Sequence, residues 1–353
     1  MKIANRHIGP GHPCYIVAEM SANHLGDYHH AHEIVRRAAA AGANAIKLQC
    51  YKPETLTLDC DRQEFQIAEV PWAGRTLYEL YQEAYTPWEW FPDLADFAHS
   101  LGMDCFASVF CQESVDYCDG LGFPAFKIAS FELTDLPLIR YAASKGKPMI
   151  LSTGMADFRE MESACNAASD SPDIALLHCI SSYPATPESA NLLAMQDMIR
   201  HPIVPFACNI GISDHTLGIA VPVAAVTLGA CIIEKHICLR RSDGGTDAGF
   251  SLEPQEFSAM VDAVRVAEAA LGEVHYGPTE SEKPNLHFRR SLFVVEDMAS
   301  GEKFSSKNVR SIRPADGLHP QYYECVLGKL AARDIKRGTP LQFNMIRGNK
   351  CTK

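Results

Sequence analysis

The sequence predicts an α/β protein, a (β/α)8 barrel followed by a small β-rich domain. Between Cys14 and Ile237, apolar runs of strand length alternate eight times with segments long enough for a helix. Eight such units in about 270 residues match the size and period of this barrel. A doubly wound open sheet is the alternative. Its dinucleotide-binding form is disfavoured, because no Gly-x-Gly-x-x-Gly turn follows the first strand.

Each element of the barrel is expected from its local pattern. Strands are predicted at 14–18, 45–49, 104–108, 125–130, 148–153, 174–179, 204–208 and 230–233. Helices are predicted at 27–42, 88–100, before Gly120, at 136–144, 158–168, 218–228 and from Pro254, with Gly272 as the last stop signal. Residues 3–13 carry turn residues at Gly9, Pro10 and Gly11 and predict a hairpin cover.

Residues 51–87 interrupt the alternation of strands and helices. They are rich in polar and aromatic residues and are too long for an ordinary connection. Insertions of this kind usually cover an active site or contact a partner. We therefore expect a lid over the site.

The composition changes at the C-terminal end of the predicted barrel. We expect a barrel domain at 1–278, a polar linker at 279–290 and a separate domain at 291–353. Within this last segment, the spacing of Asp297, Gly301 and Phe304 recurs 37 residues later at Asp334, Gly338 and Leu341. Such a repeat predicts a small β-rich domain with two similar loops. A domain of this size is only marginally stable alone, which favours docking on another subunit.

Bulk composition restricts the partners and the compartment. The net charge of −11 argues against nucleic acid as the main partner, although a local basic cluster can still bind a small anion. Thirteen scattered cysteines without a Cys-x-x-Cys pair, and no signal peptide, predict reduced thiols and a cytoplasmic protein. The longest uncharged stretch, 216–233, is short and contains Pro222, so no membrane span is expected.

Two histidines lie near the ends of successive predicted strands. His215 and His236 each lie close to a carboxylate, Asp214 and Glu234. The carboxyl ends of neighbouring barrel strands meet at one mouth, where both rings can bind one metal ion. Because only two protein ligands are evident, the pattern favours an exchangeable Mn²⁺ or Mg²⁺. The alternative is that both histidines have a structural role, either in the core or as helix caps, and make their hydrogen bonds within the protein.

Two lysines stand inside otherwise apolar strands. An unpaired ammonium at Lys47 or Lys127 would be costly, so each needs an anionic ligand or a carboxylate. Serines at the ends of nearby strands can complete a phosphate cradle: Ser108, Ser130, Ser152 and Ser181. An ordinary buried ion pair between Lys and Glu is the alternative reading of either lysine.

These residues belong to motifs that resemble the sialic acid synthase family. The matching motifs are AEMSANH at 18–24, IKLQ at 46–49, FKIASFE at 126–132, LSTGM at 151–155, SDHT at 213–216 and EKH at 234–236. The C-terminal segment, with FRRSL at 288–292 and SIRP at 311–314, resembles the antifreeze-like (SAF) domain of that family. The resemblance implies a condensation of phosphoenolpyruvate with an amino sugar.

The resemblance also implies a role for each site residue. Those implied to bind phosphoenolpyruvate are Lys47, Ser108, Lys127, Ser130, Ser152, Ser181 and Ser213. His215 and His236 match metal ligands, Glu19 matches a carboxylate near the reacting carbons, and Glu234 is the next catalytic candidate. Residues implied to contact the acceptor sugar are Gln49, Glu132, Tyr183, Asp247 and Arg313. Arg313 matches an arginine that enters the barrel of the other subunit, which implies a domain-swapped homodimer.

Within the family, AEMSANH, YTPWEW at 85–90 and RSDGG at 241–245 look most like the synthases of pseudaminic acid. The implied acceptor is 2,4-diacetamido-2,4,6-trideoxy-L-altrose. Legionaminate and N-acetylneuraminate synthases are alternatives, because GTDAG at 245–249 departs from the common pattern beside the sugar. Two alternatives come from other functional classes. One is a metal-dependent hydrolase with a barrel fold, and the other is a carbohydrate-binding protein without enzymatic activity.

Overall fold

A computed structural model describes residues 1–68, 72–200 and 209–348 of the chain. The chain forms two compact units, Met1–Gly272 and Glu273–Lys353. We describe each unit by itself.

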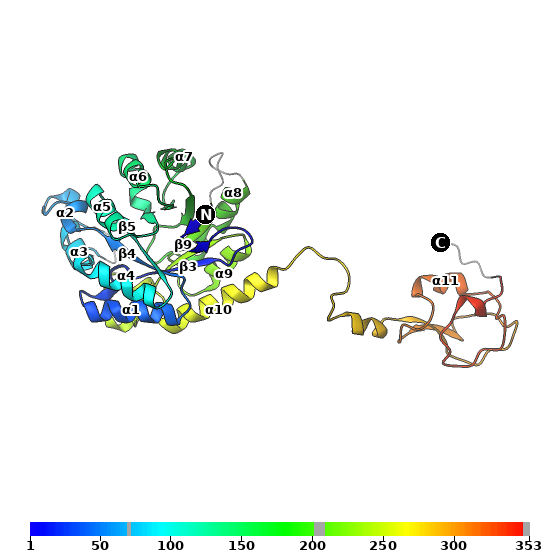
Figure 1. The fold of residues 1–353 in the computed structure, drawn as a ribbon. Helices are drawn as coiled ribbons and strands as arrows, with labels where there is room; N and C mark the ends of the chain where they lie inside the picture. Colours follow the sequence, from blue (N-terminus) through cyan, green and yellow to red (C-terminus); the bar gives the residue numbers. More distant parts are fainter. Residues whose placement is uncertain (69–71, 201–208, 349–353) are drawn as a thin grey trace. The chain divides into compact units, whose positions relative to one another are not determined.

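The first unit is a closed barrel of eight parallel strands, in the order β10-β3-β4-β5-β6-β7-β8-β9 (Figure 1). This arrangement confirms the predicted (β/α)8 barrel. The strands are β3 (Tyr15–Glu19), β4 (Ala45–Cys50), β5 (Asp104–Val109), β6 (Phe126–Ile128), β7 (Met149–Ser152), β8 (Ile174–Cys179), β9 (Asn209–Asp214) and β10 (Ile232–His236). The apolar run at 204–208, predicted as a strand, lies outside the described residues, and the strand before His215 is β9.

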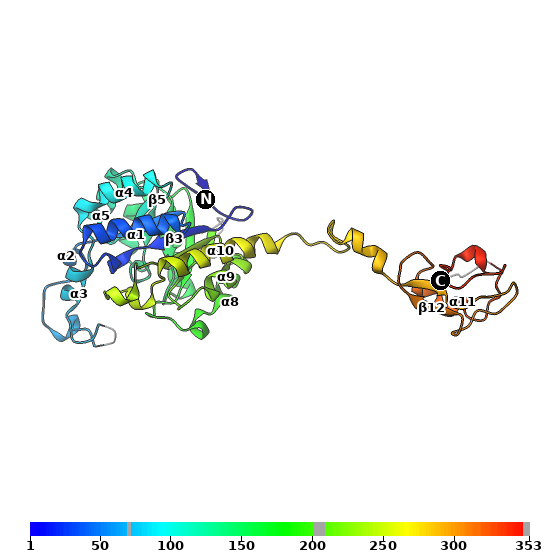
Figure 2. The ribbon, with the colours of Figure 1, turned by 90° about the horizontal axis from the view of Figure 1, so that it is seen from below.

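Helices cover the outside of the barrel (Figures 1 and 2). They are α1 (Tyr28–Ala40), α4 (Phe91–Ser100), α5 (Gln112–Gly120), α6 (Leu136–Ala143), α7 (Phe158–Ala167), α8 (Leu192–Arg200), α9 (Ala220–Thr227) and α10 (Pro254–Leu271). Local capping explains several of these ends. The Asp27 carboxylate accepts the first free amides of α1, Pro254 is the first residue of α10, and Gly272 ends α10 with a positive φ of 53°.

The barrel core consists of residues that the strands and helices bury on facing surfaces. All five residues of β3 are buried. On the helix side, α1 buries the residues that recur at helical spacing: Ala31, Ile34, Val35 and Ala38. The apolar periodicity of the sequence thus directs each helix onto the sheet. The strand ends remain free to carry polar groups.

The opening segment forms the expected hairpin at a different place. Strand β1 (Lys2–Ile3) pairs antiparallel with β2 (Arg6–His7), so the turn is at Ala4 and Asn5 rather than at Gly9 to Gly11. Ala4 has a φ of 47°. The two glycines also have positive φ, but they lie beyond the hairpin.

The segment 51–87 contains two short helices, α2 (Pro53–Leu56) and α3 (Leu77–Ala84). Helix α3 packs against the 3-10 turn Ser21–His24, which follows β3 at the mouth of the barrel. From the same segment, the indole nitrogen of Trp72 donates a hydrogen bond to the Thr246 carbonyl, at 3.3 Å. These contacts are with loops at the carboxyl ends of the strands. A lid function for the segment stays a prediction.

The second unit contains the antiparallel pair β11 (Ser291–Val294) and β12 (Val309–Ile312) and the short helix α11 (Tyr323–Val326). Its 37-residue repeat appears as reciprocal hydrogen bonds. The Asp297 carboxylate accepts the Arg337 amide at 2.8 Å, and the Asp334 carboxylate accepts the Ser300 amide at 2.7 Å. Because each loop caps the other, the repeated aspartates lock the two similar loops together.

The cysteines are free thiols at ten described positions, eight of them buried. Cys325, in α11, is disulfide-bonded, so the expectation of reduced thiols is wrong at this residue. Within the described ranges, no helix is both long and apolar enough to cross a membrane.

Candidate active site

The predicted site residues lie on strands whose register places them side by side. Glu19, the last residue of β3, pairs with Lys47 on one side and with His236 on the other. Ser108 pairs with Lys127 across β5 and β6. Because all eight strands are parallel, these carboxyl-terminal residues share one mouth of the barrel.

Lys47 is the centre of a buried charge network. Its ammonium lies 2.9 Å from a Glu19 oxygen and 3.3 Å from a Glu234 oxygen, and it donates a hydrogen bond to the Ser108 hydroxyl at 3.0 Å. The side chains of the three charged residues are at most 5% exposed. Lys47 is therefore paired with carboxylates, as the ion-pair interpretation predicts. It also belongs to a polar cluster at the mouth, as the anion-binding interpretation predicts.

Lys127 approaches the same network from the opposite side. It donates to the Ser152 hydroxyl at 2.6 Å and to the Ile128 carbonyl at 2.9 Å, and it lies 4.0 Å from the same Glu234 oxygen. That oxygen also accepts the Ser213 hydroxyl at 3.0 Å. Glu234 is thus the anion that holds both lysines and one of the predicted serines in place.

The electrostatics of this network differ from group to group. Burial raises the pKa of Glu19, and the neighbouring Glu234 carboxylate adds to this. Burial opposes the charge of Glu234, but Lys127 and Lys47 outweigh it and lower the pKa of Glu234. Burial, together with the charge of Lys47, lowers the pKa of Lys127 to about 8. Such perturbed groups in one cleft are typical of catalytic sites.

Two more of the predicted serines meet at Gly154, a residue that the sequence reading did not single out as a site residue. The Gly154 amide donates to the Ser130 hydroxyl at 3.1 Å. A Cβ at Gly154 would lie 2.7 Å from the Ser130 hydroxyl oxygen and closer still to that of Ser181. A side chain at this position would therefore clash with both hydroxyls, so glycine lets the two serines approach the backbone closely. Its signal in the sequence was the Ser-Thr-Gly triplet after a buried strand.

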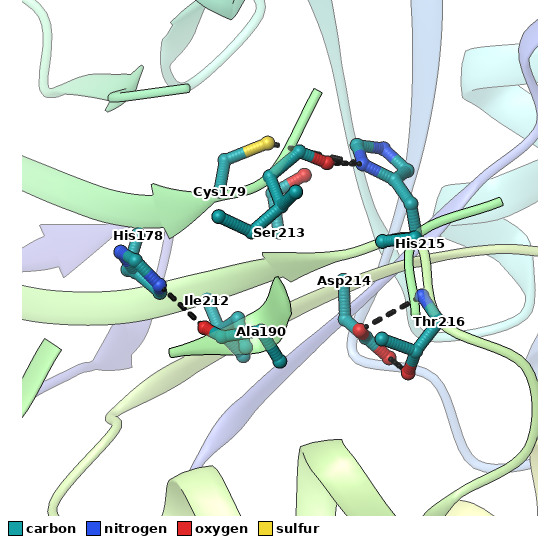
Figure 3. A pocket seen from close by; sticks show the side chains of 10 residues that line it. His178, Cys179, Ala190, Ile212, Ser213, Asp214, His215 and Thr216 are labelled. Atoms are coloured by element: carbon teal, nitrogen blue, oxygen red, sulfur yellow. Dashed lines mark hydrogen bonds between the residues drawn. The ribbon is translucent and has the colours of Figure 1, made fainter. Parts of the chain in front are cut away.

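The two histidines lie next to each other, with ring centroids 5.3 Å apart. The Nδ1 atom of His215 is 3.0 Å from the Ile180 carbonyl and 3.8 Å from the Cys179 sulfur (Figure 3). Because a carbonyl can only accept a hydrogen bond, Nδ1 carries the proton. The lone pair of Nε2 is then available to bind a metal ion.

The donor set fits a divalent metal ion bound by these two rings. His236 has a buried Nδ1 with no hydrogen-bond partner among the described residues. Burial and the neighbouring His215 hold the pKa of His236 well below its usual range, which favours the neutral ring that a metal ligand needs; burial also lowers the pKa of His215, but its contacts with Cys179 and Ile180 outweigh this and raise it. No third His, Cys, Asp or Glu completes a metal cluster within the described ranges. Substrate or water oxygens would have to supply the remaining ligands.

Three of the predicted acceptor residues fall into two groups. Gln49 donates to Glu19 at 3.0 Å and to the Ser21 hydroxyl at 2.9 Å, and that hydroxyl in turn donates to the Asp247 carboxylate. Ser21, not singled out before, links two predicted sugar contacts. Its signal was the abrupt polar run after the first strand.

The second group of acceptor residues is aromatic. The Tyr183 ring centroid lies 4.4 Å from that of His215 and 5.1 Å from that of Phe250. Trp72, from the segment 51–87, lies 6.1 Å from Tyr183. Phe250 and Trp72 were not predicted as site residues, and an isolated aromatic residue in a loop carries no sequence signal for such a role.

Glu132 lies in the 3-10 turn after β6, where the charges of Lys127 and Lys47 act on its carboxylate. Burial raises the pKa of Glu132 to about 7, and one of its oxygens has no hydrogen-bond partner among the described residues. Arg313 is an exposed residue of the second unit, directly after β12. Its place relative to the barrel stays a prediction.

Comparison with known proteins identifies the family. Residues 34–276 match the model of the NeuB family, and residues 289–347 match that of the SAF domain. The first match alone covers more than half of the chain. The chain belongs to the NeuB family. The NeuB region contains every barrel residue of the site except those at the end of β3.

Curated proteins similar to this NeuB-family chain are synthases of nonulosonic acids. The chain is 43% identical to a pseudaminic acid synthase of Campylobacter jejuni, over 93% of this chain and 95% of that protein. It is 35% identical to an N,N'-diacetyllegionaminic acid synthase of Legionella pneumophila, over 96% of each. Among solved structures, an N-acetylneuraminic acid synthetase of Leptospira borgpetersenii is 32% identical with a TM-score of 0.71, covering 82% of this chain and 95% of that one.

Proposed function

We propose that the protein is a pseudaminic acid synthase, which condenses phosphoenolpyruvate with 2,4-diacetamido-2,4,6-trideoxy-L-altrose and releases phosphate. The observation that carries this proposal is the meeting of two buried lysines and five serines with a histidine pair at one barrel mouth. The high identity to a pseudaminic acid synthase supports the choice of acceptor. A legionaminate synthase is the second candidate, since its relative covers the chain equally well.

Phosphoenolpyruvate would bind between Lys47 and Lys127. Its phosphate and carboxylate are anions, and in their absence Glu19 and Glu234 neutralise the two ammonium groups. The hydroxyls of Ser130 and Ser181, which face the space above Gly154, would donate to phosphate oxygens. Hydrogen bonds to charged groups are each worth about 1.5–3 kcal/mol, so such a cradle orients the substrate firmly.

The aldehyde of the open-chain sugar would lie on the histidine side of the mouth. A divalent ion held by His215 and His236, Mn²⁺ or Mg²⁺, would polarise that aldehyde as a Lewis acid. Gln49, Ser21 and Asp247 would fix the polar groups of the sugar, while Tyr183 would line its apolar face. Holding both substrates in this way can supply roughly 7–11 kcal/mol of the acceleration.

The reaction would then proceed in two stages. C3 of phosphoenolpyruvate attacks the aldehyde carbon, and positive charge develops at C2. Water adds to C2, and the resulting tetrahedral carbon loses phosphate by cleavage of its C–O bond. Glu19, held between Lys47 and Gln49, would orient that water or stabilise the charge, and Glu234 is the next candidate.

The decisive experiment measures phosphate release from phosphoenolpyruvate. We expect release only when a diacetamido sugar and a divalent metal are both present. A panel of 2-acetamido and 2,4-diacetamido hexoses identifies the acceptor, and preference for a legionaminate precursor would select the second candidate. An ¹⁸O label in the bridging C–O bond of phosphoenolpyruvate should appear in phosphate. Label retained in the sugar acid would contradict C–O cleavage.

A pH profile tests the role of Lys127. Its pKa is lowered to about 8, and its charged form is the one that binds phosphate. The ammonium is present below that pH and is lost above it, so kcat/KM for phosphoenolpyruvate should fall as the pH rises through about 8. In Lys127→Arg, whose guanidinium stays charged, this limb should move to higher pH. An unchanged limb would assign it to another group.

Arg313 tests the contribution of the second unit. If it reaches the acceptor in a partner subunit, Arg313→Ala should raise the acceptor KM by about 10- to 100-fold and leave the KM for phosphoenolpyruvate unchanged. Arg310→Ala is the matched control, because Arg310 is an exposed arginine of β12, the strand that Arg313 directly follows. Wild-type constants in both variants would exclude the contact.

Co-expression of two impaired variants, assayed at low acceptor concentration, tests the predicted domain-swapped homodimer. A subunit with His215→Ala still carries Arg313, and a subunit with Arg313→Ala still carries the histidine pair. In a swapped dimer, one of the two sites is then complete, so activity should recover. Failure to recover activity in a proven mixed dimer would contradict the swap. We propose that this reaction takes place in the cytoplasm, since ten free cysteines fit a reducing compartment, whereas the disulfide at Cys325 does not support that location.

A further inference from the structure

A buried ion pair connects the two strands that carry the histidines. Asp214 is the last residue of β9, Lys235 is the penultimate residue of β10, and the register places them opposite each other. Their charged atoms are 2.5 Å apart, and the side chains are 2% and 0% exposed.

Thr216 joins the pair to the chain beyond β9. The Asp214 carboxylate accepts the Thr216 amide at 3.0 Å and its hydroxyl at 3.1 Å. The Lys235 ammonium donates to the Thr216 carbonyl. Three polar groups of one residue are thus bound by the two partners of one ion pair. The backbone on both sides of His215 is held as a result.

The pair lies behind the strands, away from the mouth. Ser213 and Glu234 point into the barrel and bond to each other, so the next residues along the strands, Asp214 and Lys235, point outward. Figure 3 shows the Asp214 carboxylate and Thr216 on the opposite side of the chain from the His215 ring. Because both side chains point away from the inside of the barrel, they do not contact a ligand in the mouth.

We propose that Asp214 and Lys235 are positioning residues that set the separation and direction of His215 and His236 for binding one divalent ion. Each member of the pair directly precedes one of these histidines, and the pair and Thr216 tie the two backbones together. The inference rests on the proposed metal role of the histidines.

The Asp214–Lys235 ion pair contributes more to local geometry than to the stability of the fold. A buried ion pair contributes little net stability compared with apolar residues of similar volume, because both charges lose their hydration. Its geometry is nevertheless specific, since the carboxylate and the ammonium together bind all three polar groups of Thr216. Replacing the pair by an apolar pair should therefore preserve folding and remove the connection to Thr216.

The test compares metal binding in a double variant with metal binding in the wild type. Asp214→Leu combined with Lys235→Met keeps the buried volume and removes the charges. Mn²⁺ is titrated into substrate-free protein, and free Mn²⁺ is followed by electron paramagnetic resonance. Changes in groups that orient metal ligands typically weaken binding by about 10- to 100-fold, and we expect a Kd increase in this range. The Tm should change little, and the KM for phosphoenolpyruvate should stay within about twofold.

The control is a second ion pair of the barrel unit. Arg265 and Glu268 lie on α10 and are 2.9 Å apart. Arg265→Met with Glu268→Leu should leave the Mn²⁺ Kd unchanged. If the first double variant fails to fold, Asp214→Asn combined with Lys235→Met replaces it, because this pair also removes both charges and asparagine keeps the shape of the aspartate side chain.

Outcomes separate this inference from the proposed function. A folded Asp214→Leu/Lys235→Met protein with the wild-type Mn²⁺ Kd would overturn the inference. If that protein is unfolded, a wild-type Kd in Asp214→Asn/Lys235→Met would overturn it. Wild-type protein that binds no Mn²⁺ would also overturn it. The synthase assay on the same wild-type preparation tests the proposed function independently, since the titration needs no substrate.

Discussion

His215→Ala is expected to lower kcat by about three orders of magnitude while the protein stays folded. Lewis-acid polarisation of a carbonyl contributes several kcal/mol, and each 1.36 kcal/mol corresponds to a factor of ten in rate. The ring is held by the Ile180 carbonyl and packs against Tyr183 and His236, so its loss removes a ligand and some packing. Steady-state kinetics at saturating Mn²⁺ and a thermal melt measure the two effects separately.

The matched control for His215→Ala is His178→Ala. His178 is also buried at the end of a strand, but its Nε2 is bound to the Ala190 carbonyl, 2.8 Å away. This variant should lose some stability and keep its Mn²⁺ affinity. Near-normal turnover of His215→Ala with metal present would contradict the metal assignment.

Lys47→Met is expected to raise the KM for phosphoenolpyruvate by about 100-fold, the loss of one charge-assisted interaction of nearly 3 kcal/mol. It also leaves Glu19 and Glu234 facing each other without their shared cation. Breaking a buried ion pair in this way costs about 3–5 kcal/mol, so the Tm should fall as well. Isothermal titration with phosphoenolpyruvate separates binding from turnover.

The control for Lys47→Met is Lys145→Met, which breaks a surface ion pair with Asp116. Surface pairs are worth little, so neither substrate binding nor the Tm should change appreciably. An unchanged phosphoenolpyruvate affinity in Lys47→Met would show that the lysine is only the structural partner of the two carboxylates.

Repetition made most of the barrel predictable. Strand-length apolar runs recur at regular spacing, and each packs against a helix whose apolar face has its own period. Lys47 and Lys127 were recognisable as site residues because a charge inside an apolar strand needs a partner. The 37-residue repeat was visible for a similar reason, since two equivalent aspartates make equivalent hydrogen bonds.

Contacts between distant segments were not predictable in the same way. Gly154 and Phe250 belong to the site through the register of strands and the paths of loops, and neither is an unusual residue in its own stretch of sequence. The hairpin turn was misplaced because Ala4, rather than a glycine, adopts the positive φ. The Cys325 disulfide was missed because single, scattered cysteines do not reveal their distances in space.

By itself, the sequence determined the eight β/α units, the polar residues at the strand ends and, through its motifs, the family. Those features are local, because periodicity, caps and charged residues in apolar runs act over a few neighbouring residues. Only the tertiary structure decided that Glu234 binds both lysines, and that Asp214 and Lys235 join the histidine strands from behind. Such contacts depend on the register of a closed barrel, which brings together residues that are far apart in the chain.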